Sequence, residues 1–207
     1  MELSAWYEGQ YRTDSGAYGY AGDRVLEESS ELFWARALLI YTLPDSRQRF
    51  DVNLTMGASL HADRFSAYRL GGTLPMGTEF PLSIPGYFDG ELSARNFACF
   101  TGQYTLPLDA AKRWSLNPLG SIATVDYVTG LGQPGHFNSG VGIGLGYRSR
   151  SGTWQLMASY GYGFEAIRSN GRDGQSVGLV LQIDLGSSHP NGPSRMDTIT
   201  GFLLNHF

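Results

Sequence analysis

The chain has 207 residues and a formal net charge of −4. This length fits a single domain, and the charge argues against nucleic acid as a partner, because a phosphate backbone is bound by a basic surface. A single cysteine, Cys99, excludes an internal disulfide, and no apolar run approaches the length of a transmembrane helix. The 28 glycines and the 13% of aromatic residues are typical of an all-β chain with many tight turns.

Apolar and polar residues alternate with a period of two, which predicts strands with two different faces. In chain order we expect eight of them: 3–12, 32–43, 50–60, 93–106, 114–128, 140–147, 154–162 and 176–184. The clearest is 50–60, where Leu54 and Met56 fall on one face. Asn53 and Thr55 fall on the other. In 32–43, Arg36 marks the polar face.

The connections between these strands are of two kinds. Three are short and turn-like: 43–49, 107–114 and 148–152. Four are longer: 13–31, 61–92, 129–139 and 165–175. Short turns on one side and long loops on the other are typical of outer-membrane barrels. We therefore predict one antiparallel β-barrel domain over 1–186, with a long inward or capping loop at 61–92, and a tail at 187–207.

A transmembrane barrel is favoured over a soluble one by two features. Strands of about 9–11 residues are long enough to cross a bilayer when tilted, and amphipathic rings favour the two membrane interfaces. Such rings lie near the strand ends: Tyr11, Tyr41, Tyr104, Trp114, Tyr127, Tyr147, Trp154 and Tyr162. A soluble barrel or sandwich is the alternative, and it would bury Leu54, Ile143 and Leu179 in a dry centre.

Several motifs between about residue 68 and residue 186 resemble one family. The long loop carries Arg69-Leu70-Gly71-Gly72, then Pro85-Gly86-Tyr87, then Glu91; the following strands carry Gln103 and Asp126. Together these resemble the barrel of the bacterial surface antigen family, which includes the outer-membrane protein assembly factors of Gram-negative bacteria. The resemblance implies the C-terminal half of a sixteen-stranded barrel whose loop folds inward.

Two positions depart from the family pattern. Pro85 stands where the family has a loop arginine, and Gln103 stands where the barrel wall has a glutamate. The loop arginine and the wall glutamate are lost together, because a buried glutamate without its cation would carry an uncompensated charge. Asp126 matches an inward aspartate of the family, and we expect Arg69 or Arg95 to be its partner.

The last predicted strand resembles an outer-membrane insertion signal, in which a polar residue and a glycine precede spaced apolar residues. Its matching positions are Ser176, Gly178, Leu181 and Ile183. The first residues of the chain lack the basic and apolar regions of a signal peptide. We expect a signal peptide to have been removed, or the chain to be part of a longer one.

The size of the loop limits the architecture. An eight-stranded barrel is just filled by its own side chains, so it cannot also hold a loop of this length. The small inward residues, among them Gly140, Gly142 and Gly161, leave space inside the predicted barrel for another group. Either the loop caps a complete small barrel, or the chain is half of a larger one, completed by upstream sequence or by a second copy in a homo-oligomer.

No catalytic or metal-binding pattern stands out. His61, His136, His189 and His206 have no metal-ligand spacing, and Ser121, Asp126 and His136 form only a weak catalytic set. We expect no enzyme activity, cofactor or metal. The expected function is a pore or platform for protein insertion or translocation, with outer-membrane lipid or lipopolysaccharide as surroundings. The alternatives are the membrane anchor of a longer chain such as a patatin-like lipase, and a stand-alone structural barrel.

Overall fold

The computed structural model describes residues 1–20, 22, 24–46, 48–73, 82–169 and 171–184. The strands in this part of the chain are numbered β1 to β11. Eight of them are long: β1 (Glu2–Tyr11), β4 (Ser29–Thr42), β5 (Arg49–Leu60), β7 (Leu92–Pro107), β8 (Trp114–Tyr127), β9 (Phe137–Arg148), β10 (Trp154–Arg168) and β11 (Gly171–Ile183). Three are short: β2 (Gly16–Tyr18), β3 (Arg24–Leu26) and β6 (Tyr68–Leu70). The described residues hold no helix long and apolar enough to cross a membrane.

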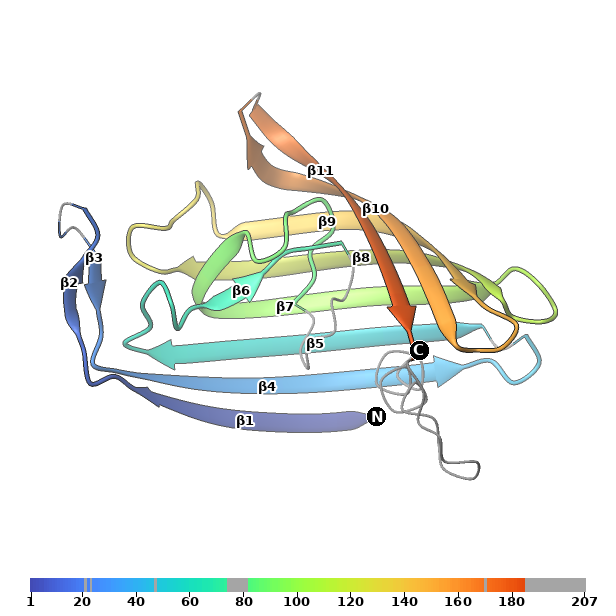
Figure 1. Cartoon of the computed structure of the whole chain (residues 1–207), viewed down its shortest axis with the longest axis horizontal. Coiled ribbons are helices and arrows are strands. Elements are labelled where there is room, and N and C mark those ends of the chain that lie inside the picture. Colours follow the sequence, from blue (N-terminus) through green and yellow to red (C-terminus); the bar gives the residue numbers. More distant parts are fainter. Residues whose placement is uncertain (21, 23, 47, 74–81, 170, 185–207) are drawn as a thin grey trace.

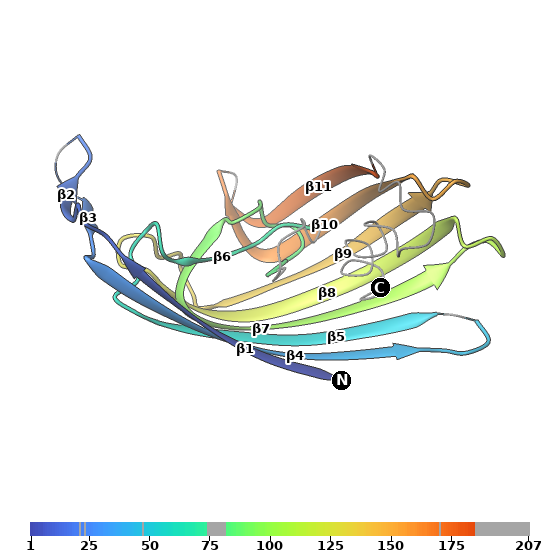
Figure 2. The ribbon, with the colours of Figure 1, turned by 60° about the horizontal axis from the view of Figure 1, so that its bottom comes forward.

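The eight long strands form one antiparallel sheet in which each strand pairs with the next along the chain (Figure 1). The order is β1-β4-β5-β7-β8-β9-β10-β11; β6 adds to β7, and β2 and β3 form a separate hairpin. Within the described residues, β1 and β11 pair with no strand on their outer sides. The sheet curves into an open trough, and β6 lies on its concave side (Figure 2).

All eight predicted strands are present, and the short connections are confirmed at 43–48, 108–113 and 149–153. The prediction of a long loop at 165–175 is wrong, because β10 runs to Arg168 and β11 begins at Gly171. A bulge between Gly163 and Ile167 interrupts the alternation there and hides the end of β10. The predicted tail at 187–207 lies outside the described residues.

The two faces of the sheet differ in the way that the alternation predicts. On the convex face, Leu54 is 37%, Ile143 44% and Leu179 70% exposed. On the concave face, Thr55 and Ser159 are polar and buried. The apolar rows that contain Leu54, Ile143 and Leu179 therefore do not converge in a dry centre.

Aromatic rings gather on the convex face near the short turns. Trp114 lies 4.6 Å from Tyr147, which lies 5.3 Å from Trp154, and Phe50 lies 4.6 Å from Tyr104, all measured between ring centroids. The register explains the grouping, because Trp114 pairs with Tyr147 and Phe50 pairs with Tyr104 across neighbouring strands. The short-turn end of the sheet thus carries a partial aromatic band.

Candidate functional site

The candidate site is the segment that lies on the concave face, which we call the inner loop: residues 61–73 and 82–91. Its strand β6 pairs with β7, with Tyr68 opposite Ala94 and Leu70 opposite Leu92. A bridge between Gly72 and Ile84 closes the loop on itself. Figure 2 shows β6 raised above the floor of the trough.

The principal hydrophobic core lies between the inner loop and the sheet. The loop contributes Leu70, Ile84 and Tyr87, none of which has any exposed surface. The wall contributes buried residues of β7 and β8, among them Phe97 and Val125. Burying these side chains gives the loop a fixed place inside the trough.

Glycines of β9 and β10 let the loop backbone reach the sheet. A Cβ atom on Gly140 would lie 2.1 Å from the Pro85 carbonyl oxygen, and one on Gly161 would lie 2.5 Å from the Gly86 amide nitrogen. Gly86 itself has a φ of +85°, and a Cβ there would lie 1.8 Å from the Gly163 nitrogen. The Pro85-Gly86-Tyr87 motif is therefore the point where backbone packs directly on backbone.

Polar contacts connect the same motif to the wall. The Gly86 amide donates a hydrogen bond to Ser176 Oγ in β11 at 3.2 Å, and the hydroxyls of Thr73 and Ser176 are also hydrogen-bonded. The Tyr87 hydroxyl donates to Asn138 Oδ1 in β9 at 3.1 Å. Ser176, predicted as the polar residue of an insertion signal, thus also holds the loop.

The remaining positions of that predicted signal follow the alternation of β11. Gly178 lies opposite Ser159 of β10. Leu181 and Ile183 are exposed on the convex face. The strand therefore presents small or polar residues to the loop and apolar residues to the outside.

An ion pair joins the inner loop to β10. Arg168 donates from Nη1 to Glu91 Oε1 at 2.7 Å and from Nη2 to Glu91 Oε2 at 3.0 Å. The same guanidinium donates to the Gly86 carbonyl at 3.0 Å and lies 4.3 Å from the centroid of the Phe88 ring. Glu91 also accepts the Phe88 amide hydrogen at 2.7 Å. Because both side chains of the pair are mostly buried, this bidentate contact holds the end of the loop.

Sequence reasoning placed Glu91 in the loop motif but missed Arg168, because 165–175 was expected to be a loop. The ion pair can be compared with the family pattern, from which this chain departs at Pro85. The loop supplies the carboxylate and the wall supplies the arginine, whereas the family pattern has a loop arginine and a wall carboxylate. The Glu91–Arg168 ion pair is therefore a contact that was not predicted from the sequence.

Two other predicted site residues, Gln103 and Asp126, do not contact each other inside the trough. Gln103 lies in β7 opposite Asp51 and Leu119. Asp126 was expected to face inward and instead lies on the convex face, since its neighbour Val125 is the buried one. An ion pair with Arg95 at 3.4 Å confirms one of the two partners expected for Asp126.

The other expected partner of Asp126 is engaged elsewhere. Arg69 donates to the Arg64 carbonyl at 2.6 Å and to the Ser93 hydroxyl. Asp126 instead accepts a second contact from its own side of the sheet, a hydrogen bond from Asn96 Nδ2 at 2.8 Å. Arg69 therefore stabilises the inner loop itself.

A buried carboxylate holds the start of the inner loop. Burial raises the pKa of Asp63, but hydrogen bonds from the Ser66 and Phe65 amides and from Arg12 outweigh this and lower the pKa to about 2. A further hydrogen bond comes from the Glu27 amide at 3.1 Å. Asp63 thus ties the inner loop to the connection between β1 and β4.

The weak catalytic set is not assembled. Ser121 is buried on the concave face, where its hydroxyl donates to the Ser83 carbonyl at 2.8 Å, and Asp126 lies on the opposite face. The His136 Nδ1 atom contacts the Val125 carbonyl oxygen at 2.9 Å. Among the residues that the structure describes, no three His, Cys, Asp or Glu side chains are grouped to hold a metal ion.

The features that bear on function are therefore the exposed apolar face, the concave face with its inner loop, and the outer edges of β1 and β11, which pair with no other described strand. The chain matches no model of a known protein family, and no curated protein matches it.

Proposed function

We propose that this chain is half of an outer-membrane β-barrel of the surface antigen type, and that the closed barrel is a pore or platform for protein insertion or translocation. The observation that carries the proposal is the inverted arrangement of the two faces: the convex face is exposed and apolar, and the concave face is polar where the loop does not cover it. A soluble sheet buries its apolar face, whereas a transmembrane barrel turns it to lipid.

Strand length and the aromatic band support a membrane setting. The eight long strands have between 10 and 16 residues, and a bilayer needs about 9–11 residues in a tilted strand. Trp114, Tyr147 and Trp154 adjoin one another at the short-turn end of the convex face. Amphipathic rings at this position suit the interface between hydrocarbon and headgroups.

The two free edges support closure by a second sheet. An unpaired edge leaves backbone N–H and C=O groups unsatisfied, which is costly in lipid. Because the number of long strands is even, β1 begins and β11 ends at the short-turn rim, so the two edge strands run antiparallel. A second copy related by a two-fold axis along the trough would pair β11 of one copy with β1 of the other on both sides. An upstream half-barrel in a longer chain would do the same.

The inner loop defines what such a barrel could do. Its described part is held at Gly86, Tyr87 and Glu91 to the inside of β9–β11, so in a closed barrel it would narrow the lumen from one wall. A lumen shared by two half-barrels leaves room beside the loop, as a pore or translocation platform needs.

Particle mass in detergent tests the proposal. The native chain, purified from outer membranes, should give a protein mass of twice 22.7 kDa if a second copy closes the barrel, or the mass of a longer chain if the other half lies upstream. A chain that stays monomeric and soluble without detergent would contradict the membrane assignment.

Single-channel conductance then separates a pore from an anchor. A barrel with an open lumen should conduct ions in a planar bilayer, and removal of the Glu91–Arg168 contact should increase the variability of the current. A correctly inserted particle that never conducts would argue against the pore and favour a membrane anchor.

A further inference from the structure

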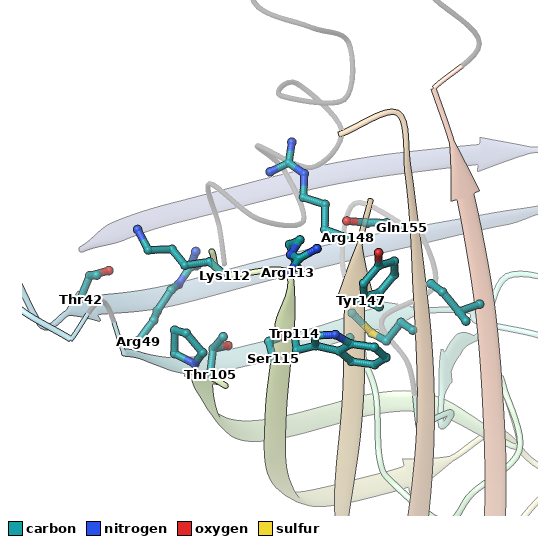
Figure 3. Close-up of a pocket in the computed structure, with 14 residues that line it drawn as sticks. Thr42, Arg49, Thr105, Lys112, Arg113, Trp114, Ser115, Tyr147, Arg148 and Gln155 are labelled. Atoms are coloured by element: carbon teal, nitrogen blue, oxygen red, sulfur yellow. The ribbon is translucent and has the colours of Figure 1, made fainter. Parts of the chain in front are cut away.

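The concave face contains a hollow at its short-turn rim, far from the inner loop. It encloses about 380 Å³ between the ends of β4, β5, β7, β8, β9 and β10 (Figure 3). Four cationic side chains line it: Arg49, Lys112, Arg113 and Arg148. A second hollow shares the last three of these and adds Arg150. Among the described residues, no carboxylate lines either hollow.

Carboxylates lie around the hollow and balance part of this charge. Asp51 pairs with Arg49 at 2.7 Å, and Asp109 pairs with Arg113 at 3.4 Å. Asp45 and Asp184 belong to the same rim without lining the hollow. Asp51 and Asp109 thus neutralise part of the charge of Arg49 and Arg113, although neither carboxylate is among the residues that line the hollow.

Lys112 has a feature that core packing does not explain. Its backbone φ is +54°, a left-handed conformation that glycine or asparagine adopts more easily than lysine. The turn that holds it is firm, because Asp109 accepts hydrogen bonds from the Arg113 amide at 2.7 Å and the Trp114 amide at 2.8 Å. The Lys112 ammonium makes no ion pair with any residue that the structure describes. A rigid turn thus presents an unneutralised cation at the hollow.

Neutral and apolar groups complete the lining. Thr105, Ser115 and Gln155 offer hydroxyl and amide groups. Trp114 and Tyr147, which belong to the aromatic band of the convex face, also line the hollow at the rim. Arginine forks and a lysine ammonium together match the several oxygens of a phosphate group. Hydroxyls and an amide can satisfy the remaining oxygens.

We infer that this hollow binds a phosphate-bearing anion at the short-turn mouth of the trough. The phosphate comes either from the headgroup of an anionic phospholipid or from a soluble phosphate. The inference goes beyond the proposed function and does not require it, since binding of a soluble phosphate would hold for a protein that is not in a membrane.

Calorimetric titration of the full chain in a neutral, phosphate-free detergent tests the inference, with three probes. They are inorganic pyrophosphate, dihexanoyl phosphatidic acid below its micellar concentration, and dihexanoyl phosphatidylcholine. Binding of both anionic probes is expected for a general phosphate site. Binding of phosphatidic acid alone would assign the site to a lipid headgroup, and binding of pyrophosphate alone to a soluble phosphate.

Two variants locate the binding. Lys112→Gln and Arg148→Gln should each raise the dissociation constant of the bound probe at least tenfold. Arg95→Gln removes a cation of similar size from the convex face near the long loops and should change it less than twofold. Unchanged far-ultraviolet circular dichroism spectra would show that the variants are folded.

The outcomes that overturn the inference are specific. One is the absence of binding of either anionic probe at low salt. Another is binding that Lys112→Gln and Arg148→Gln leave unchanged, and a third is binding that Arg95→Gln weakens as much as they do. Equal binding of phosphatidylcholine and phosphatidic acid would also overturn it, because the interaction would then depend on the acyl chains.

Discussion

The inner loop contacts the two halves of the sheet in different ways. Toward β4, β5 and β7, the short strand β6 pairs with the start of β7, and the tight side-chain contacts are between rings. Tyr68 lies 5.0 Å from Trp34 and 5.0 Å from Phe97, measured between ring centroids. Toward β9–β11 the contacts are between backbones, where Gly140 and Gly161 leave no space for a side chain. A ring can rotate to accommodate a changed neighbour, but a backbone can do so only if its whole strand moves. The Pro85-Gly86 part of the loop is therefore the part with the least freedom to adjust, and it lies against the C-terminal half of the sheet.

The largest effect is expected where backbone meets backbone. Gly140→Ala would place a Cβ atom 2.1 Å from the Pro85 carbonyl oxygen, so the loop must lift from β9. We expect a loss of about 3 kcal/mol in the free energy of unfolding, as for overpacking against an unyielding neighbour. Denaturant titration in detergent measures this loss, and faster proteolysis of the loop should accompany it.

Two other glycine-to-alanine variants serve as controls for Gly140→Ala. Gly102→Ala meets nothing within 4 Å and should leave stability nearly unchanged. Gly57→Ala meets the Phe97 ring, which can turn aside, so its effect should lie between those of the other two variants. Equal losses for Gly57→Ala and Gly140→Ala would show that the two halves do not differ as described.

The ion pair of the C-terminal half comes next. Glu91→Gln and Arg168→Gln should each lower the free energy of unfolding by roughly 2 kcal/mol, because each leaves a mostly buried charge without its partner. The double variant should lose less than the sum of the two. A double-mutant cycle measures the coupling, and simple additivity would show that the two side chains do not act as a pair.

The Asp63 contact at the start of the loop should give a pH dependence. Its pKa is lowered to about 2 in the folded chain, so its contribution to stability is complete above the unfolded pKa of about 4 and is lost as the pH falls toward 2. We expect about 1–2 kcal/mol to disappear over this range. Asp63→Asn should be less stable at pH 7 and less sensitive to pH between 4 and 2. A variant with the full pH dependence of the native chain would contradict this assignment.

The smallest effect is expected on the convex face. Asp126 and Arg95 form an ion pair in which both side chains are nearly half exposed, and exposed pairs contribute about 0.5 kcal/mol or less. Asp126→Asn should therefore change the free energy of unfolding, measured by thermal denaturation, by no more than about 0.5 kcal/mol. A loss as large as that of Glu91→Gln would mean that Asp126 has a buried partner.

The strands could be predicted because alternation is a direct consequence of the geometry of a sheet with two different environments. Segment 50–60 shows this most clearly, since every apolar residue of its pattern from Leu54 onward is exposed on one face. The end of β10 could not be predicted, because the bulge after Gly163 breaks the period. The strands β2, β3 and β6 have three residues each, which is too few for alternation to be visible.

The candidate site was predicted in part. The motifs at Gly71, Gly86 and Glu91 do lie in a loop on the concave face, as the resemblance to the surface antigen family implied. Arg168 was missed because its strand was missed. The orientation of Asp126 was within reach of the sequence, since Ile122 lies four residues before it and an even spacing puts both side chains on the same face.

The central claim is that the convex face meets lipid, and the four tryptophans test it most directly. Trp114 and Trp154 are exposed on that face, whereas Trp34 packs on the core inside the trough. Variants that keep one tryptophan and replace the other three with phenylalanine would be reconstituted in vesicles of brominated lipid. The account predicts strong quenching of Trp114 and Trp154 fluorescence and little quenching of Trp34. Quenching of Trp34 alone, or of none of the three, would contradict it.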